Sequence, residues 1–281
     1  MSQPTWGPEA SRSEALVPRS RVPEVSIVIP AYNEARRIVP TLASRIEYFD
    51  ARSLPYEIIV VDDGSRDSTA AVVREVARWH ASLRLIRLPS NLGKGAAVRT
   101  GVRNAAGQLV LLDDADGATP IAEFSRLREA VDAGADVAIG SRAFPGEQSK
   151  IERRLLRFVT GRVFAFVVNR WVVPGIADTQ CGFKLFKGAV ARRIFALQQL
   201  DGFAFDVEAL HLAQVFGHTV AEVPIHWADV PGSKVSVATD SLRMLWDVLR
   251  TPLVVRRSLN QGAPLLPELE PEPLQLGSPS R

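Results

Sequence analysis

Short apolar runs that alternate with segments of helical periodicity are the feature that most restricts how this chain can fold. The five runs are 25–30 (VSIVIP), 56–63 (YEIIVVDD), 83–88 (LRLIRL), 108–114 (QLVLLDD) and 136–141 (DVAIGS). Short runs rich in Val, Ile and Leu are typical of strands buried on both faces. Residues 34–50 and 67–81 read as helices, the second capped by Asp67 or Ser68. The alternation predicts an α/β fold with a mainly parallel sheet flanked by helices.

Polar residues follow several of the predicted strands. Ligands of parallel sheets bind outside the carboxyl ends of the strands, so these residues should gather along one edge. They are Asn33, Glu34, Asp62, Asp63, Asp113, Asp114 and Asp116.

The segment LLDDADGAT (111–119) places three carboxylates within four positions and has no basic residue beside them. Like charges at this spacing raise one another's pKa unless a cation or ligand offsets the repulsion. A solvated turn is the other interpretation, because Asp, Gly and Thr are ordinary turn residues. From this segment alone, both readings stay open.

Three further strand ends carry groups that could bind a ligand. PAYNE (30–34) offers an accessible backbone, the Tyr32 ring and Glu34, although Asn33 and Glu34 also suit a helix start. The tandem Asp62 and Asp63 could accept hydrogen bonds from a base and a ribose. NLGKGAAVRTG (91–101) combines glycines with Lys94, whose charge suits phosphate. It lacks Walker A spacing, and no G-x-G-x-x-G follows the first strand, which argues against a Rossmann dinucleotide enzyme.

Composition excludes several classes of protein. A formal net charge of +3 and the lack of a basic block argue against nucleic acid as a partner. The single cysteine, Cys181, rules out an internal disulfide and a cysteine-rich zinc site, and fits a reducing cytoplasm. His211, His218 and His226 lack the spacing of metal ligands.

The chain is expected to form one domain over 23–258, with disordered tails at 1–22 and 259–281. The first tail has no apolar core, so a secretory signal is not expected. No stretch provides the ~20 apolar residues of a spanning helix. In 153–173, arginine and phenylalanine interleave at every fourth position, which indicates an interfacial helix or an ordinary amphipathic core helix. The basic segment 241–258 could pack beside it, as a second interfacial helix.

Taken in order, the four strand-end segments resemble family 2 glycosyltransferases of the GT-A fold. GSRAF (140–144), DTQCGFKLF (178–186) and FAFDVEAL (203–210) extend the likeness to the polyprenyl-phosphate hexosyltransferases, in particular those that glucosylate dolichyl phosphate. The resemblance covers about residues 24–250. It implies an inverting transfer of glucose from UDP-glucose to a polyprenyl or dolichyl phosphate, at the cytoplasmic membrane surface.

The resemblance also implies roles for the donor site. Asp116 would bind Mg²⁺ or Mn²⁺, with Asp114 reaching the metal or the ribose, while Asp113 receives no role. Asp63 would meet the nucleobase and Asp62 would position the turn. The other residues expected at the nucleotide sugar are Pro30, Ala31, Tyr32, Glu34, Lys94 and Ala115.

An acceptor phosphate ionises with a second pKa of about 6, so its attack on the sugar needs no strong general base. Arg142 is the leading candidate for binding this phosphate, and Lys184 and Lys234 are weaker ones. Asp178 is a catalytic candidate that could orient the acceptor or brace its own turn. Asp206 and Glu208 are alternatives, although their apolar surroundings indicate a buried helix start.

Three other functions remain open at the level of sequence. The chain could transfer mannose from GDP-mannose to the same lipid, or a sugar to a soluble hydroxyl acceptor. It could also be a non-catalytic scaffold that binds lipid or nucleotide, although Asp114, Asp116 and Asp178 are all present.

Overall fold

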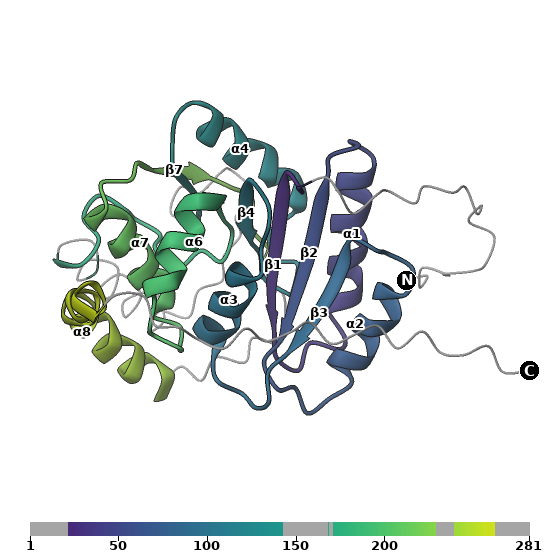
Figure 1. Cartoon of the computed structure of the whole chain (residues 1–281), viewed down its shortest axis with the longest axis horizontal. Coiled ribbons are helices and arrows are strands. Elements are labelled where there is room, and N and C mark those ends of the chain that lie inside the picture. The colour runs from purple at the N-terminus through teal and green to yellow at the C-terminus, as the bar shows by residue number, and fades with distance from the viewer. Residues whose placement is uncertain (1–21, 143–167, 169–170, 229–238, 262–281) are drawn as a thin grey trace, which may run out of the picture.

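The computed structural model describes residues 22–142, 168, 171–228 and 239–261 of the chain. In this part a seven-stranded sheet lies between two layers of helices (Figure 1). The strands are β1 (Val25–Ala31), β2 (Tyr56–Asp62), β3 (Leu83–Arg87), β4 (Leu109–Leu112), β5 (Val137–Ser141), β6 (Lys184–Lys187) and β7 (Val220–Pro224). All five predicted strands are confirmed, within one or two residues at their ends.

The sheet has the order β3-β2-β1-β4-β6-β5-β7 and is mainly parallel, as predicted. β6 is the exception, because it pairs antiparallel with both β4 and β5. The sequence analysis predicted neither β6 nor β7. β6 has only four residues, and every residue of β7 stays partly accessible, so neither forms a long apolar run.

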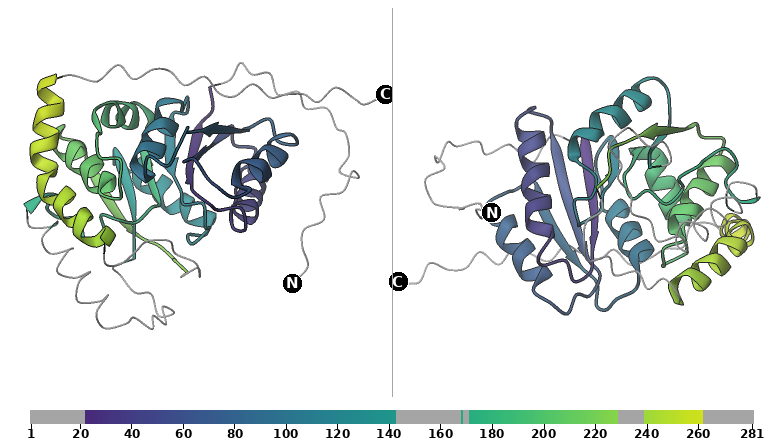
Figure 2. Two further views of the ribbon diagram at one scale, coloured as in Figure 1. Left: turned by 90° about the horizontal axis from the view of Figure 1, so that it is seen from below. Right: turned by 180° about the vertical axis from the view of Figure 1, so that it is seen from behind.

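Strand side chains alternate between the two faces of the sheet and so divide the core in two. Ile27 and Ile29 of β1 face one layer, which contains α1 and α2, while Val28 faces the layer of α3, α6 and α7. Figure 2 shows the two layers from below and from behind. The helices of the first layer are α1 (Ile38–Asp50), α2 (Thr69–Ala77), η1 (Ile121–Glu123) and α4 (Phe124–Asp132). Those of the second are α3 (Lys94–Arg103), α6 (Gly188–Leu197), α7 (Phe205–Val215) and α8 (Thr239–Gln261).

The membrane-related predictions have different outcomes. Most of the predicted interfacial helix 153–173 (residues 153–167 and 169–170), Lys234 and both tails except their innermost residues lie outside the described part of the chain. The segment 241–258 is helical, and α8 continues to Gln261, beyond the predicted end of the domain. Among the described helices, none combines the length and apolarity needed to cross a bilayer.

Candidate active site

The candidate site lies where the strand order reverses. After β1 the chain moves to one side of the sheet through β2 and β3, then returns to the other side of β1 as β4. A crevice outside the carboxyl ends of such strands is the usual ligand position in open α/β sheets. Residues after β1 and β4 meet there, as predicted. β5 ends at the same edge with Ser141, and the reversed strand β6 begins there with Lys184.

Each carboxylate of the acidic loop, residues 113–118, has a basic partner from elsewhere in the chain. The sequence analysis found no such partner beside the segment and left a bound cation or ligand and a solvated turn open. Asp113 pairs with Arg45 of α1, Asp114 with Lys94 of α3, and Asp116 lies close to Arg37 before α1. These cations lie far away in sequence, and the fold brings them together.

Asp113 and Arg45 form a buried, two-pronged ion pair beneath the site. The Arg45 Nε and Nη2 atoms donate to the two carboxylate oxygens at 2.7 and 3.1 Å, and Nη2 also donates to the Thr119 carbonyl. Burial raises the pKa of Asp113, and Arg45 opposes this without reversing it. Because both side chains are almost fully shielded from solvent, the pair fixes the loop to α1 instead of binding a substrate.

Asp114 is partly exposed and pairs with Lys94. The Lys94 Nζ lies 2.6 Å from Oδ1 of Asp114, and the two side chains are 23% and 39% exposed. Burial alone raises the pKa of Asp114, but the Lys94 ammonium outweighs it, so the pKa lies below its usual range. On its other side Asp114 touches Gly182, where an added Cβ would lie 2.1 Å from Oδ2.

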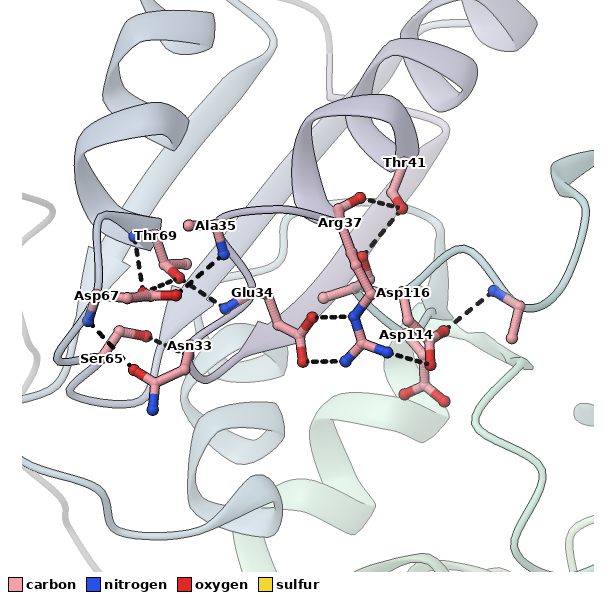
Figure 3. A network of polar contacts seen from close by, with 12 residues as sticks. Asn33, Glu34, Ala35, Arg37, Thr41, Ser65, Asp67, Thr69, Asp114 and Asp116 are labelled. Carbon is pink, nitrogen blue, oxygen red and sulfur yellow. Dashed lines mark hydrogen bonds and ion pairs between the residues drawn. The ribbon is translucent and has the colours of Figure 1, made fainter. Parts of the chain in front are cut away.

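Arg37 connects Asp116 to Glu34, as Figure 3 shows. Its Nε and Nη2 donate to the Glu34 carboxylate at 2.6 and 2.5 Å, and its Nη1 lies 3.8 Å from Oδ2 of Asp116. The Glu34 hydrogen bonds raise the pKa of Arg37. Oδ1 of Asp116 accepts the backbone N–H of Ala118 at 3.0 Å. The Thr41 hydroxyl lies near the carbonyl oxygens of Arg37 and Ala115, so the acidic loop and the start of α1 form one unit.

The loops after β1 and β2 are tied together by side chains that the sequence analysis considered for a helix start. Asn33 adopts a left-handed backbone (φ 55°), and its Oδ1 accepts the N–H groups of Arg66 and Asp67. The predicted cap of α2 is Asp67, whose Oδ1 accepts the Thr69 N–H at 2.9 Å; Ser68 makes no side-chain bond there.

The carboxylates of Asp62 and Asp63 both accept hydrogen bonds from backbone N–H groups. Oδ1 of Asp62 accepts the N–H of Ser65 at 3.1 Å, a hydrogen bond within the turn that follows β2. The Asp63 oxygens accept the N–H groups of Leu92 and Gly93 at 2.7 and 2.9 Å. Asp63 therefore shapes the glycine segment that precedes Lys94. Its predicted contact with a nucleobase stays a prediction. Burial raises the pKa of Asp63.

Arg142, the candidate for binding the acceptor phosphate, and Asp178, the catalytic candidate, form an ion pair with each other. Arg142 Nε and Nη2 donate to the carboxylate at 2.7 and 2.8 Å, and its backbone N–H donates at 2.9 Å. Burial raises the pKa of Asp178, but Arg142 outweighs it, so the net pKa lies below the usual range. Glu222 of β7 accepts the N–H groups of Ala177 and Asp178, and the Arg142 guanidinium lies 5.6 Å from the Trp227 ring centre.

Lys184 is fully buried, which corrects its candidacy as a ligand of the acceptor phosphate. Its Nζ lies 2.5 Å from Oδ1 of Asp206 and also donates to the Cys181 carbonyl. Asp206 and Glu208 are likewise buried at the start of α7, as their apolar surroundings indicated. Glu208 accepts the N–H groups of Gln199 and Leu200. The Lys184–Asp206 pair and the Glu208 hydrogen bonds therefore stabilise the buried structure beside the site.

The three histidines considered in the sequence analysis contact residues outside the acidic loop. The rings of His211, His218 and His226 contact Val172, Asp136 and Glu123 respectively. Within the described ranges, no cluster of three or more His, Cys, Asp or Glu side chains is arranged to bind a metal ion. Asp116 and Asp114 are 29% and 39% exposed, so their carboxylate oxygens are accessible to a hard cation.

Sequence reasoning missed four residues of this site: Arg37, Arg45, Glu222 and Trp227. Arg37 carried a weak signal, because it follows Glu34 by three residues and such pairs meet on a helical turn. The others are brought to the site only by tertiary structure.

The comparisons with known proteins agree on one family. The model described as glycosyl transferase family 2 matches residues 26–195. A dolichyl-phosphate beta-glucosyltransferase of Trichomonas vaginalis is 38% identical over 83% of this chain and 72% of its own. The human protein of that name is 36% identical over 80% and 74%.

Solved structures show the same fold. Mannosyl-3-phosphoglycerate synthase from Rubrobacter xylanophilus has a TM-score of 0.62 at 20% identity, over 88% of this chain and 79% of its own. Glucosyl-3-phosphoglycerate synthase from Mycobacterium tuberculosis in complex with Mn²⁺ and UDP-glucose has a TM-score of 0.56 at 18% identity, over 83% and 79%.

Proposed function

The chain belongs to glycosyl transferase family 2 and is a glycosyltransferase of the GT-A fold, and we propose that it transfers glucose from UDP-glucose to a polyprenyl phosphate of the dolichyl type. One observation carries the proposal: relatives from a protist, a slime mould, human and yeast match about four fifths of the chain and share one activity in their names. The site geometry supports it, because the edge of the sheet presents two separate regions for anions.

The first region is proposed to bind the donor. Pro30, Ala31 and Tyr32 end β1 beside the Asp62–Asp63 turn, and we assign the nucleoside to this corner. Backbone N–H groups hold the Asp63 carboxylate, and Arg37 holds that of Glu34. The oxygens of both are therefore fixed before a ligand arrives. Lys94, Asp114 and Ala115 follow along the edge, where the sugar diphosphate would lie. Fixed donors and acceptors reduce the entropy lost on binding.

A divalent metal, Mg²⁺ or Mn²⁺, fits this region. Such ions prefer oxygen ligands and take one or two protein carboxylates, with phosphate and water completing the shell. Asp116 and Asp114 supply these oxygens, with Asp116 as the direct ligand. When bound, the ion would neutralise charge on the departing diphosphate. Arg37 and Lys94 hold the two carboxylates in place.

The second region, around Arg142, is proposed to bind the acceptor phosphate. A guanidinium binds phosphate through two parallel N–H groups on one edge. In Arg142 this edge, Nε and Nη2, donates to the carboxylate of Asp178. Asp178 therefore orients Arg142. When the acceptor binds, its phosphate displaces Asp178 from Arg142 or shares the guanidinium with it. The phosphate oxygen is already ionised at neutral pH and attacks the anomeric carbon itself, with inversion. We place this step at the cytoplasmic membrane surface, with the protein bound peripherally.

The direct test uses purified protein, polyprenyl phosphate, divalent metal and either labelled UDP-glucose or labelled GDP-mannose. We expect label in the lipid phase from UDP-glucose. Label from GDP-mannose alone would replace glucose by mannose as the sugar. No label from either donor would reject the proposal and favour a soluble acceptor or a non-catalytic scaffold.

A further inference from the structure

Helix α8 exposes a row of large apolar side chains. Trp246, Leu249 and Leu253 are 65%, 51% and 61% exposed. Their spacing of three and seven positions places them on one face of the helix. Isolated exposed apolar residues are common, but three on adjacent turns form a continuous patch that indicates an interaction surface.

The opposite face of α8 packs against the rest of the domain. Val248, Thr251, Val255 and Ser258 are buried to at least 98%. Val248 and Val255 belong to the core cluster that includes α6 and α7. Figure 2 shows α8 along the outer side of this layer. The exposed row is therefore not needed to dock α8 on the domain.

Charge on α8 distinguishes among partners for this row. Arg250, Arg256 and Arg257 are exposed beside it. Asp247 is the only acidic residue of residues 246–261, and it is 8% exposed and paired with Arg250. Over residues 246–261, the outer face thus combines tryptophan, leucine and arginine and exposes no carboxylate. That combination is typical of helices that lie in the interface of an anionic bilayer.

We propose that α8 lies flat on the anionic surface of a lipid bilayer, with Trp246, Leu249 and Leu253 inserted between head groups and the three arginines contacting lipid phosphates. The inference deepens the proposed function, on which it rests for its purpose, because it names the surface that brings the protein to its lipid acceptor. Lipid binding itself does not depend on which sugar is transferred.

The first part of α8 contacts the region proposed to bind the acceptor. Met244 lies two residues before Trp246 on α8. Its Sδ accepts a hydrogen bond from Nε2 of Gln180 at 3.0 Å. Gln180 lies between Asp178 and Cys181, on the loop that leads into β6. A bilayer in contact with α8 would therefore adjoin the region that contains Arg142 and Asp178. A polyprenyl phosphate could reach that region while its chain stays in the membrane.

The test compares the full chain with the variant Trp246→Ser/Leu249→Ser/Leu253→Ser in sedimentation with vesicles of phosphatidylcholine alone or mixed with phosphatidylglycerol. A matched control, Arg78→Gln/Trp79→Ser, removes an exposed tryptophan and an exposed arginine at the end of α2, in the other helix layer. We expect the wild type and the control to bind mixed vesicles, and the triple variant to bind at least about tenfold more weakly. Arg256→Gln/Arg257→Gln should lose binding to mixed vesicles in particular.

Activity separates this inference from the proposed function. The triple variant should glucosylate a short, water-soluble prenyl phosphate at the wild-type rate, but a long polyprenyl phosphate in vesicles at least about tenfold more slowly. Equal vesicle binding by the triple variant and the wild type would overturn the inference alone. A wild type that glucosylates neither acceptor would overturn the proposed function instead. A dimer that the triple variant loses, without any loss of vesicle binding, would assign the row to a second copy of the chain and reject the lipid surface.

Discussion

The guanidinium of Arg142 lies edge to edge with the carboxylate of Asp178, at 2.7 Å from Nε to Oδ2 and 2.8 Å from Nη2 to Oδ1. The sequence singled out these residues separately, one for acceptor phosphate and one for catalysis. Their pairing means that neither can act without affecting the other. A phosphate that uses the same edge of Arg142 must compete with Asp178 for it.

Neutralising Asp178 should therefore separate binding from turnover. In Asp178→Asn we expect the KM for polyprenyl phosphate to fall about threefold, because a competing anion is gone. We expect kcat to fall about a hundredfold, because Arg142 loses its orientation. Steady-state kinetics with varied acceptor measure both values. A raised KM with unchanged kcat would contradict the competition. Arg142→Lys, which cannot form the two-pronged contact, should raise the KM about tenfold.

Asp116→Asn should abolish detectable transfer while leaving the midpoint of thermal unfolding within about 2 °C of wild type, because the side chain is partly exposed and makes one backbone hydrogen bond. Titration calorimetry of Mn²⁺ in the presence of UDP should show at least about tenfold weaker binding of the metal. Unchanged Mn²⁺ binding would remove Asp116 from the metal site. Chelation of metal from the wild type should stop transfer and be reversed by added Mg²⁺ or Mn²⁺.

Asp113 should matter for stability. Asp113→Ala leaves Arg45 buried without its carboxylate, and such broken buried pairs cost about 3–5 kcal/mol of unfolding free energy. Replacing both residues, as in Arg45→Met/Asp113→Leu, should cost less than the single change, because no buried charge remains. Urea unfolding of the three proteins gives the comparison. A double variant that is less stable than Asp113→Ala would contradict this reading.

Gly182→Ala should impair transfer without unfolding the protein. The new Cβ would lie 2.1 Å from Asp114 Oδ2, and the flexible carboxylate would have to move away from its position beside Lys94. We expect at least a tenfold rise in the Kd of UDP, measured with metal present, and little change in melting temperature. Gly202→Ala is the matched control, because its Cβ would meet only Asp247 Oδ2, at 4.0 Å. Equal effects of the two changes would refute the Asp114 contact.

The Asp136 carboxyl group should make the free energy of unfolding depend on pH in the acid range. Lys187 and Thr219 lower its pKa from 3.8 to about 2, chiefly through the hydrogen bond from Lys187. A carboxyl group whose pKa is lower in the folded state stabilises fully above pH 3.8, and the effect disappears as pH falls toward about 2. Asp136→Asn should therefore lose about 1 kcal/mol at neutral pH, since solvent screens this partly exposed pair. The difference from wild type in urea unfolding should shrink below pH 4; a difference that grows there would contradict the assignment.

Sequence patterns predicted strands β1 to β4 well, because each is an apolar run and the four pair as an ordinary parallel sheet. The partners of the acidic loop could not be predicted in this way. Arg45 and Asp113 are 68 residues apart, and only packing of α1 against the sheet brings them together. Lys184 looked like an accessible cation because its neighbours in sequence do not reveal Asp206, which approaches from α7.

The reversed direction of β6 has an evolutionary consequence. The chain leaves the sheet after Ser141 of β5 and rejoins it at Lys184 of the neighbouring strand β6, at the same edge. Because both points lie at one edge of the sheet, the number of residues between them can change without altering the order or register of these two strands. Relatives could therefore differ in the length of this stretch while keeping β1 to β4 and their parallel register unchanged.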